Sequence, residues 1–579
     1  MCGAACLVAA LYSLPQLIYS ASGGSGAFLL QEDEPAYVAR VARAAQGHSH
    51  VGNPWLWEHA GDPTPLPTLA ENVLALPARA FALVSGDAPS VDTLVILWRL
   101  FLPALGLFAL VAALRSLGMK RGLTLSAAFV VFVSPGLVTY KPLGALLFGA
   151  TSLPLDRFTN PLFPLVTFFL AWAASARALL ASSRKGHWAA ASGALTALHF
   201  YISVYYWTHL VLAMLIAALA LGIRSHWKVV AIYLVTVALF SIPYWVSLRA
   251  VVSNPAYELY AWRNGLLLHD RGWYLFAHKA LWVMVAACVP LFWRREPGAR
   301  ILLGGILAGL GCYFSPIITG LSLQNFHWHY TLAPMLIVGV FWSGSEVIDR
   351  VFRGRPKWLT LLGALSLATV SADALVATLR WSRILSSPLG PMGVGSHDRA
   401  YAGAWRWLKS HAPPDAVVAA GEETMPGIPM HTGLRVWTDL HNNAELVSFD
   451  EIRKRYLLIW ALEHENPVSL RERLCPKAPL PVAQWDVGLS QAQVDHVKRL
   501  GLPAIDVPLS CDFADVSVSG YAGGNDEIAA LGHSFRLDYV VMGPNERGWA
   551  PEDILELEPV HDAGGIRVLR VIAWRPARN

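Results

Sequence analysis

Three consecutive carboxylates, Glu32, Asp33 and Glu34, directly follow the first apolar run of the chain. A carboxylate beside a substrate hydroxyl can take its proton and so act as a general base. The acids also precede Pro35, where we expect a helix to begin, and negative charge is favourable at a helix N-terminus. Because capping needs only one acid, we assign Asp33, with Glu34 beside it, as candidate catalytic carboxylates.

Further ionisable residues gather in the polar segments between later apolar runs. These are Lys141, Asp156, Arg157, Arg263, Arg271, His327 and His329. Such groups at the edge of a membrane domain indicate a functional site. Structural alternatives stay open at this stage. Arg157 and Arg271 could be interfacial anchors, and the two histidines flank Trp328, which fits an interfacial aromatic belt.

The composition is that of a membrane protein. The chain has 579 residues, of which 55% are hydrophobic and 15% charged, and its mean hydropathy is +0.43. Soluble domains carry about 25% charged residues. The formal net charge of +5 is small for this length and argues against a nucleic-acid partner. The partners that this composition predicts are membrane lipids.

Apolar runs long enough to span a bilayer recur along the first two thirds of the chain. Since a spanning helix needs about 20 apolar residues, we expect about eleven spans. They lie at roughly 2–20, 92–115, 122–139, 161–182, 188–202, 203–223, 229–248, 275–293, 301–321, 330–349 and 358–379. The stretch 188–222 is too long for one crossing, so we divide it at "HFYISVYYW".

Short basic loops between these spans predict the orientation. Their sequences are RSLGMKRG, SSRKGHW, IRSHWK, WRREPGAR and DRVFRGRPKW. With eleven spans all five fall on one side, which the positive-inside rule makes the cytoplasm. The N-terminus is then cytoplasmic in a multi-pass inner or plasma membrane protein. Segments 30–90, 140–160, 249–274, 322–329 and the C-terminal region lie outside the cytoplasm. We treat the first run as an uncleaved span, and whether Met1 is the true start stays open.

From about residue 395 the chain becomes more polar, which predicts a transmembrane domain over 1–385 and a soluble α/β extracytoplasmic domain over 395–579. Strands are expected at "AVVAAG", "RVWTDL", "DYVVMGP" and "GGIRVLRVIAW". Helices are expected after His397, at 449–465 and at 490–500. Neither a phosphate-loop pattern nor a nucleophile elbow is present in this region, so we expect substrate recognition or a lid. Cys475 and Cys511 could pair or remain buried thiols.

The stretch "EDEPAYVARVARA" after the first span, the long first outer loop, the number of spans and the C-terminal outer domain together resemble the GT-C superfamily of membrane glycosyltransferases. The resemblance covers the whole chain in layout, and its one sharp motif is this acidic stretch. The chain lacks the WWDYG-type signature of oligosaccharyltransferase catalytic subunits, so the resemblance disfavours that branch.

The resemblance implies a reaction and its partners. The donor is a sugar linked to a polyprenyl phosphate, and the acceptor is a glycan, lipid or protein of the cell envelope. Asp33 is the implied catalytic base, with Glu34 beside it and Asp156 as a second acid. The departing lipid phosphate needs cations, for which the candidates are Lys141, Arg157, Arg263 and Arg271, with His327 and His329 as further donors. The cofactor is unknown; Asp33 and a histidine could share a divalent cation, although no metal-ligand spacing is visible.

Two other classes of function remain open from the sequence. A transporter or flippase for a lipid-linked glycan would also be polytopic, but we find no convincing internal repeat, and the ionisable residues singled out above gather at one membrane face instead of mid-span. A non-catalytic assembly protein would bind a partner through its outer domain. Neither the sugar, the acceptor nor the oligomeric state follows from the sequence.

Overall fold

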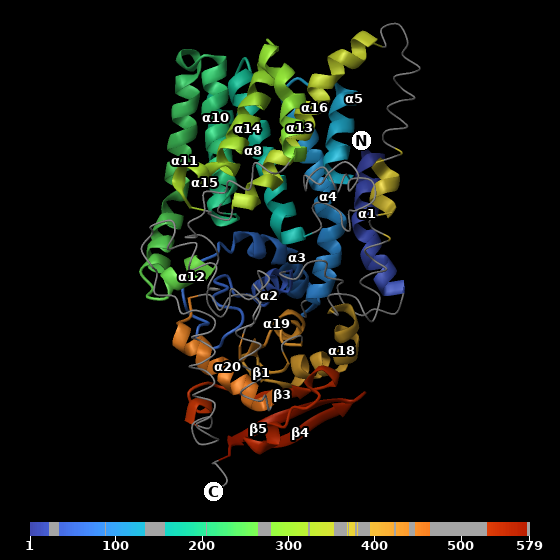
Figure 1. The fold of residues 1–579 in the computed structure, drawn as a ribbon, viewed down its shortest axis with the longest axis vertical. Coiled ribbons are helices and arrows are strands. Elements are labelled where there is room, and N and C mark those ends of the chain that lie inside the picture. Colours follow the sequence, from blue (N-terminus) through green and yellow to red (C-terminus); the bar gives the residue numbers. More distant parts are fainter. Residues whose placement is uncertain are drawn as a thin grey trace. The chain divides into compact units, whose positions relative to one another are not determined.

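The computed structural model describes residues 1–21, 34–86, 89–133, 157–203, 205–263, 279–321, 325–351, 394–421, 424–438, 446–463 and 530–575, with a few helical residues between 368 and 379. The chain divides into two compact units (Figure 1). The first unit comprises Met1–Gly23, Thr93–Val246 and Asp270–Pro391. The second comprises Gly24–Asp92, Ser247–His269 and Met392–Asn579.

The first unit is built from apolar helices. Within the described ranges, four helical segments are long and apolar enough to cross a membrane, namely α1 (Cys2–Ala21), α4 (Val91–Ser116), Thr159–Leu180 and α11 (Ile223–Val252). The third of these joins the short turn η1 (Phe158–Leu162) to α8 (Phe163–Leu180). Further helices are α5 (Arg121–Val133), α9 (Lys185–Leu198), α10 (Tyr206–Leu221), α13 (Lys279–Cys288), η4 (Val289–Trp293), α14 (Pro297–Tyr313), α15 (Ser315–Thr319), η5 (Asn325–Trp328) and α16 (His329–Val351). The predicted polytopic helical architecture is therefore confirmed, whereas the number eleven includes stretches outside the described ranges.

The predicted division of the long apolar stretch 188–222 is confirmed. Helix α9 ends at Leu198, a short turn η2 (His199–Tyr201) follows, and α10 begins at Tyr206. The prediction that IRSHWK is a loop is wrong, because this segment forms the first turns of α11. Gly222 explains the difference. Its φ of 98° lies in the region open to glycine, so the chain changes direction at one residue and needs no longer connection.

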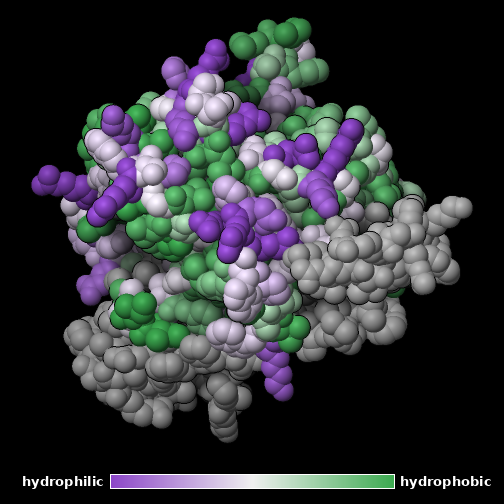
Figure 2. All heavy atoms as spheres, turned by 90° about the horizontal axis from the view of Figure 1, so that it is seen from above, coloured by the Kyte–Doolittle hydropathy of each residue, from purple (hydrophilic) through white to green (hydrophobic). Residues whose placement is uncertain are grey.

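Hydrogen bonds show that several basic connections lie at one end of the first unit. Arg177 in the last turn of α8 donates to Ser116 at the end of α4 at 3.2 Å. The His226 ring, near the start of α11, lies 3.3 Å from the Leu179 carbonyl oxygen. Arg300 of α14 donates to a carbonyl near the end of α10 at 3.3 Å. The connections after α4, α8 and α10 thus share one end, as the positive-inside argument requires. Figure 2 shows hydrophilic side chains protruding from a largely hydrophobic surface.

Among the described residues, the second unit contains a mixed sheet of five strands in the order β2-β1-β3-β5-β4. The strands are β1 (Val417–Ala419), β2 (Arg435–Val436), β3 (Tyr539–Met542), β4 (Leu555–Ala563) and β5 (Ile566–Trp574). Strand β1 pairs in parallel with β2 and β3, while β5 pairs antiparallel with β3 and β4. Four strands lie where the sequence predicts them, as do the helices α18 (Val394–His411) and α20 (Phe449–Glu463). Strand β4 was not predicted, and the helix expected at 490–500 lies outside the described residues.

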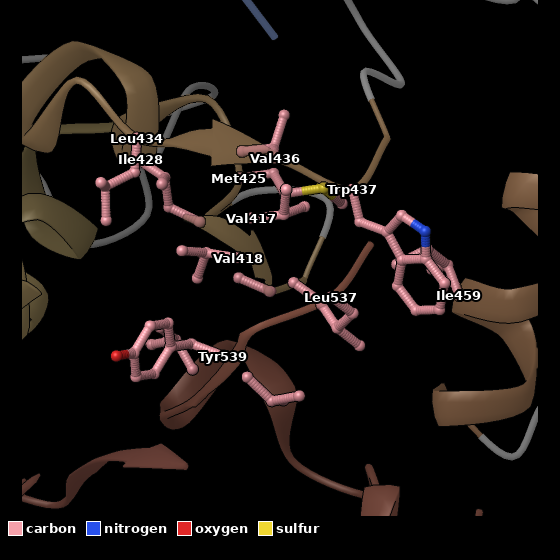
Figure 3. Close-up of a cluster of buried hydrophobic side chains, with 14 of the residues drawn as sticks. Val417, Val418, Met425, Ile428, Leu434, Val436, Trp437, Ile459, Leu537 and Tyr539 are labelled. Carbon is pink, nitrogen blue, oxygen red and sulfur yellow. The ribbon is translucent and has the colours of Figure 1, made fainter. Parts of the chain in front are cut away.

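The segment after α1 shares a hydrophobic core with the C-terminal region. This segment contains α2 (Glu34–Ala45) and α3 (Leu69–Ser85). Trp55 and Leu56 are buried in the same cluster as Val418 and Trp437. Figure 3 shows Val418 and Trp437 within this cluster. The Trp55 carbonyl accepts a 2.9 Å hydrogen bond from the Val436 amide, beside strand β2. The first predicted outer loop is therefore part of the same folded body as the C-terminal sheet.

Two further contacts complete this second unit. Helix α12 (Tyr257–Arg263) contributes Tyr260 to a small buried cluster with Leu446. The helix α19 (Gly427–Thr432) packs against α2. Three segments predicted to lie on the same side of the membrane, 30–90, 249–274 and the C-terminal region, thus contribute to one compact unit.

Candidate functional site

Three helices of the first unit begin close together. Arg157 directly precedes the turn that leads into α8, Tyr205 precedes α10, and η5 leads into α16. The Trp328 indole donates to the Tyr205 carbonyl at 2.8 Å and to the Thr208 hydroxyl at 3.0 Å. These bonds join the start of α10 to the start of α16, while α10 packs on α14 and α14 on α16. The packing fixes where the polar residues before each helix can lie.

Aromatic and cationic side chains meet at these helix starts. The Tyr205 and His327 rings are stacked, with centroids 4.5 Å apart and planes 11° apart. Arg157 donates to the Tyr330 hydroxyl at 3.5 Å. The ring of Tyr330 in turn contacts that of His329, with centroids 3.9 Å apart. Residues more than 170 positions apart in the sequence therefore form one cluster.

The charge of this cluster comes from Arg157, which is only 7% exposed. Burial, and then the positive charges of Arg157 and His329, lower the pKa of His327 to about 3. His327 is therefore neutral at neutral pH, and its ring can donate or accept a hydrogen bond without carrying charge. A buried guanidinium beside a neutral imidazole and a phenol offers hydrogen-bond donors to an anion.

The helix starts add to this positive character. The N-terminus of a helix carries about half a positive charge, because its first amide groups lack partners within the helix. Three such ends near one arginine favour a negatively charged group. This cluster, at the starts of α8, α10 and α16 with Arg157, His327, His329 and Tyr330, is the candidate anion site of the first unit.

The structure locates some of the residues predicted from the sequence. Arg157, His327 and His329 lie together in the first unit. Glu34 is the first residue of α2 in the second unit and is completely buried. Arg263 is the last residue of α12. Asp33, Lys141, Asp156 and Arg271 lie outside the described residues, so their places in the site stay predictions.

Tyr205 and Tyr330 were not among the residues predicted from the sequence. Both are adjacent to segments that the sequence analysis singled out, since Tyr205 belongs to "HFYISVYYW" and Tyr330 follows "QNFHWH". A tyrosine near the end of a span fits an interfacial belt equally well, so its residue type alone carries no signal. Only the convergence of the three segments distinguishes these two tyrosines.

No group of three histidine, cysteine or acidic residues suited to a metal ion occurs within the described part of the chain. The divalent cation that Asp33 and a histidine could share therefore stays a prediction from the sequence. Arg157 already supplies positive charge at the anion site, so the described residues offer a way to neutralise a phosphate with protein groups.

The second unit contains a different polar network, centred on His59. Its Nδ1 lies 2.6 Å from Asp62 and its Nε2 lies 2.9 Å from Glu451 of α20. Glu451 also accepts two hydrogen bonds from Arg455, at 2.6 and 2.8 Å. Arg455 donates to Glu58 at 2.7 Å. This network joins the first predicted outer loop to the C-terminal region.

The His59 network predicts a pH dependence of stability. Burial by itself lowers the pKa of His59, but hydrogen bonds and charge from Glu451 and Asp62 outweigh it, so that the pKa is raised. The stabilisation from protonated His59 is therefore complete below its ordinary pKa of about 6.5 and is lost as pH rises through the raised value. We expect His59→Gln to lower Tm, measured by tryptophan fluorescence, more at pH 6 than at pH 8.5.

The matched control for this measurement is His187→Gln, because His187 is exposed on α9. It should leave Tm unchanged at both pH values. An equal loss from His59→Gln at pH 6 and pH 8.5 would show that the charge of His59 is not involved. Glu451 governs the behaviour at acid pH. Burial by itself raises its pKa, but hydrogen bonds and charge from His59 and Arg455 outweigh it, so that the pKa is lowered. The stabilisation from ionised Glu451 is therefore lost as pH falls through this lowered pKa.

The chain matches no protein-family profile and no curated protein sequence. Solved structures do match in layout. One is the archaeal oligosaccharyltransferase AglB from Archaeoglobus fulgidus in complex with an inhibitory peptide and a dolichol-phosphate, at 12% identity and a TM-score of 0.44, covering 99% of this chain and 74% of that one. Another is ArnT from Cupriavidus metallidurans, at 14% identity and a TM-score of 0.42, covering 97% of both chains.

A third match is the arabinofuranosyltransferase AftD from Mycobacteria, at 14% identity and a TM-score of 0.43. It covers 94% of this chain but only 42% of that longer protein. Because every TM-score is below 0.5, the activity of this chain is argued from its own residues.

Proposed function

We propose that the chain is an integral membrane glycosyltransferase that takes its sugar from a polyprenyl-phosphate donor on the outer face of the membrane. The observation that carries the proposal is the buried Arg157 beside His327, His329 and Tyr330, where three helices begin. A lipid phosphate held in the membrane needs such a site, since its charge must be neutralised next to apolar helices. The acceptor is a glycan, lipid or protein of the cell envelope.

The orientation of the chain supports this proposal. The basic connections after α4, α8 and α10 lie at one end of the first unit. The residues of the anion site lie just before or at the starts of α8, α10 and α16. The other ends of these helices lead into segments that the sequence predicts to be basic loops. If the basic end is cytoplasmic, the anion site lies toward the outer face. Lipid-linked sugars are the natural donors there, because nucleotide sugars are made in the cytoplasm.

The reaction is a displacement at the anomeric carbon of the donor sugar. The acceptor hydroxyl oxygen forms a bond to this carbon, and the carbon–oxygen bond to the lipid phosphate breaks, so that the phosphate leaves with the electron pair. Asp33 takes the proton of the hydroxyl. Arg157 stabilises the negative charge on the departing phosphate, with the neutral His327 as an additional hydrogen-bond donor. In a single displacement the activated acceptor oxygen attacks from the face opposite the leaving group, which inverts the anomeric centre.

The proposal is tested with Arg157→Met in vesicles that contain the purified protein. A radiolabelled polyprenyl-phosphate sugar is supplied as donor and a membrane extract as the source of acceptor, and released polyprenyl phosphate is measured. We expect kcat/KM to fall by about 10²–10³-fold, as for other donors that stabilise charge in a transition state. Methionine keeps much of the side-chain volume, so the loss reports on the charge and the hydrogen bonds.

The control is Arg177→Met, at the opposite end of the same helix α8. Arg177 stacks on Trp188 at 4.6 Å and donates to Ser116, both in or beside the basic connections. It should leave kcat/KM close to the wild-type value. Equal activities of the two variants would contradict the assignment of Arg157. Movement of the intact donor across the membrane without release of polyprenyl phosphate would favour a flippase instead.

A further inference from the structure

Helix α2 contains two buried arginines whose surroundings differ. Arg40 is 3% exposed and forms an ion pair with Glu71 at 2.9 Å. Arg43, one turn later, is 8% exposed. Its Nη1 donates a long hydrogen bond of 3.4 Å to the Gln46 amide oxygen. Its Nε has no hydrogen-bond partner in the described part of the chain. A guanidinium buried in this way is costly unless a counter-charge accompanies it.

Two other arginines approach the same end of α2. Arg79 of α3 donates to the Ala44 carbonyl, next to Arg43, at 2.6 Å. The Gln46 side chain touches Gly433, where a Cβ would collide with it. Gly433 is only two residues before Arg435, which is 2% exposed at the start of β2. Residues of α2, α3 and β2 therefore lie in one region of the second unit, where the Arg435 guanidinium donates to the Asn53 carbonyl.

His48, just after α2, has an exposed side chain. Burial, followed by the positive charges of Arg43, Arg435 and Arg79, lowers the pKa of His48. The three arginines thus act together on one neighbouring group. Their combined positive charge therefore acts at His48, a position that a ligand from solution can reach.

Helix capping explains part, but not all, of the positive charge that the arginines place at the C-terminus of α2. The C-terminus of α2 carries about half a negative charge, and cations are favourable there. The hydrogen bond from Arg79 to Ala44 satisfies one of its terminal carbonyl groups. Arg43 adds a further positive charge at this helix end, and its Nε has no hydrogen-bond partner among the described residues.

We infer that Arg43 and Arg79, within reach of the positive charge of Arg435, form a binding site for a phosphate-type oxyanion. A phosphate can accept paired hydrogen bonds from a planar guanidinium, which explains arginines in place of lysines. The Nε of Arg43 is the donor that the anion would satisfy. The ligand is a free phosphate or a phosphomonoester headgroup, and the site does not depend on the proposed transfer reaction.

The test uses the full-length protein in detergent and measures Tm against ligand concentration at constant ionic strength, with chloride as the balancing anion. Inorganic phosphate is the probe for a free anion, and glycerol 1-phosphate is the probe for a headgroup. A ligand that binds only the folded protein raises Tm. We expect at least one probe to do so, and Arg43→Met or Arg79→Met to weaken its binding by about tenfold or more.

Arg570→Met is the matched control, because Arg570 is a half-exposed arginine of the same unit that pairs with Glu558. It should bind the probe as the wild type does. Arg43→Lys keeps the charge but not the planar fork, so its affinity should fall between those of wild type and Arg43→Met.

A second readout separates a ligand site from a structural role of Arg43. If Arg43 awaits an anion, Arg43→Met removes an uncompensated buried charge, and Tm without phosphate stays equal or rises. If Arg43 only stabilises the fold, Tm without phosphate falls, and any stabilisation by phosphate persists in the variant. That second pattern, or no stabilisation of the wild type by either probe, would overturn the inference.

Discussion

Asp33→Asn is expected to reduce glycosyl transfer by about 10²–10⁴-fold, the range that a general base contributes. Asparagine keeps the size of the side chain but cannot take the proton of the acceptor hydroxyl. The donor contacts assigned to Arg157 do not involve this carboxylate, so binding of the polyprenyl-phosphate sugar should persist. The measurement is kcat/KM for release of polyprenyl phosphate, together with donor binding to the purified protein.

Glu32→Gln is the control for this variant, because Glu32 is a neighbouring carboxylate to which no catalytic role is assigned. Its activity should be close to that of the wild type. Asp33→Glu restores a proton acceptor at a displaced position and should recover part of the lost activity. A flippase or an assembly protein would lose little function in any of these variants. Full transfer activity in Asp33→Asn would remove Asp33 from the mechanism.

The secondary structure of the C-terminal region was largely predictable because its strands are short apolar runs bounded by turn residues. AVVAAG and DYVVMGP coincide with β1 and β3. Strand β4 was missed since LELEPVHDA alternates with charged residues and contains Pro559. It lies at the edge of the sheet, where a strand is exposed and a proline is tolerated. Its identity depends on pairing with β5, which no local pattern records.

The membrane helices were predictable for a different reason. Bilayer thickness limits a span to about 20 residues, so the long run 188–222 had to be divided. The basic loops fall on one side of the membrane only if this run forms two spans. In the structure the two helices are separated between Leu198 and Tyr206. Length and charge therefore carry information about membrane topology that does not require tertiary contacts.

The composition of the second unit could not be read from the sequence. The hydrogen bond from Val436 to Trp55 and the contact of His59 with Glu451 join residues more than 375 positions apart. Such contacts leave no periodic signal in either segment. The sequence did predict that Arg157, His327 and His329 fall in outer segments, but their closeness depends on the packing of α10, α14 and α16.

The other large effect concerns the buried ion pair between Arg40 and Glu71, which joins α2 to α3. Arg40 also donates to the carbonyl oxygens of Leu66 and Pro67, at 3.1 and 3.2 Å. Arg40→Met leaves the Glu71 carboxylate buried without its counter-charge, which typically costs about 3–5 kcal/mol. In a unit of this size we expect Tm to fall by about 5–10 °C, measured by tryptophan fluorescence of the full-length protein.

The double variant Arg40→Met/Glu71→Met decides whether the loss comes from the broken pair. Removing both charges leaves no uncompensated carboxylate, so its loss should be smaller than that of Arg40→Met alone. Losses that simply add would contradict the pairing. Arg570→Met, in the half-exposed pair with Glu558, should change stability by less than about 1 kcal/mol. Because α2 begins at Glu34, directly after Asp33 in the chain, Arg40→Met should also lower transfer activity, whereas the double variant recovers part of both properties.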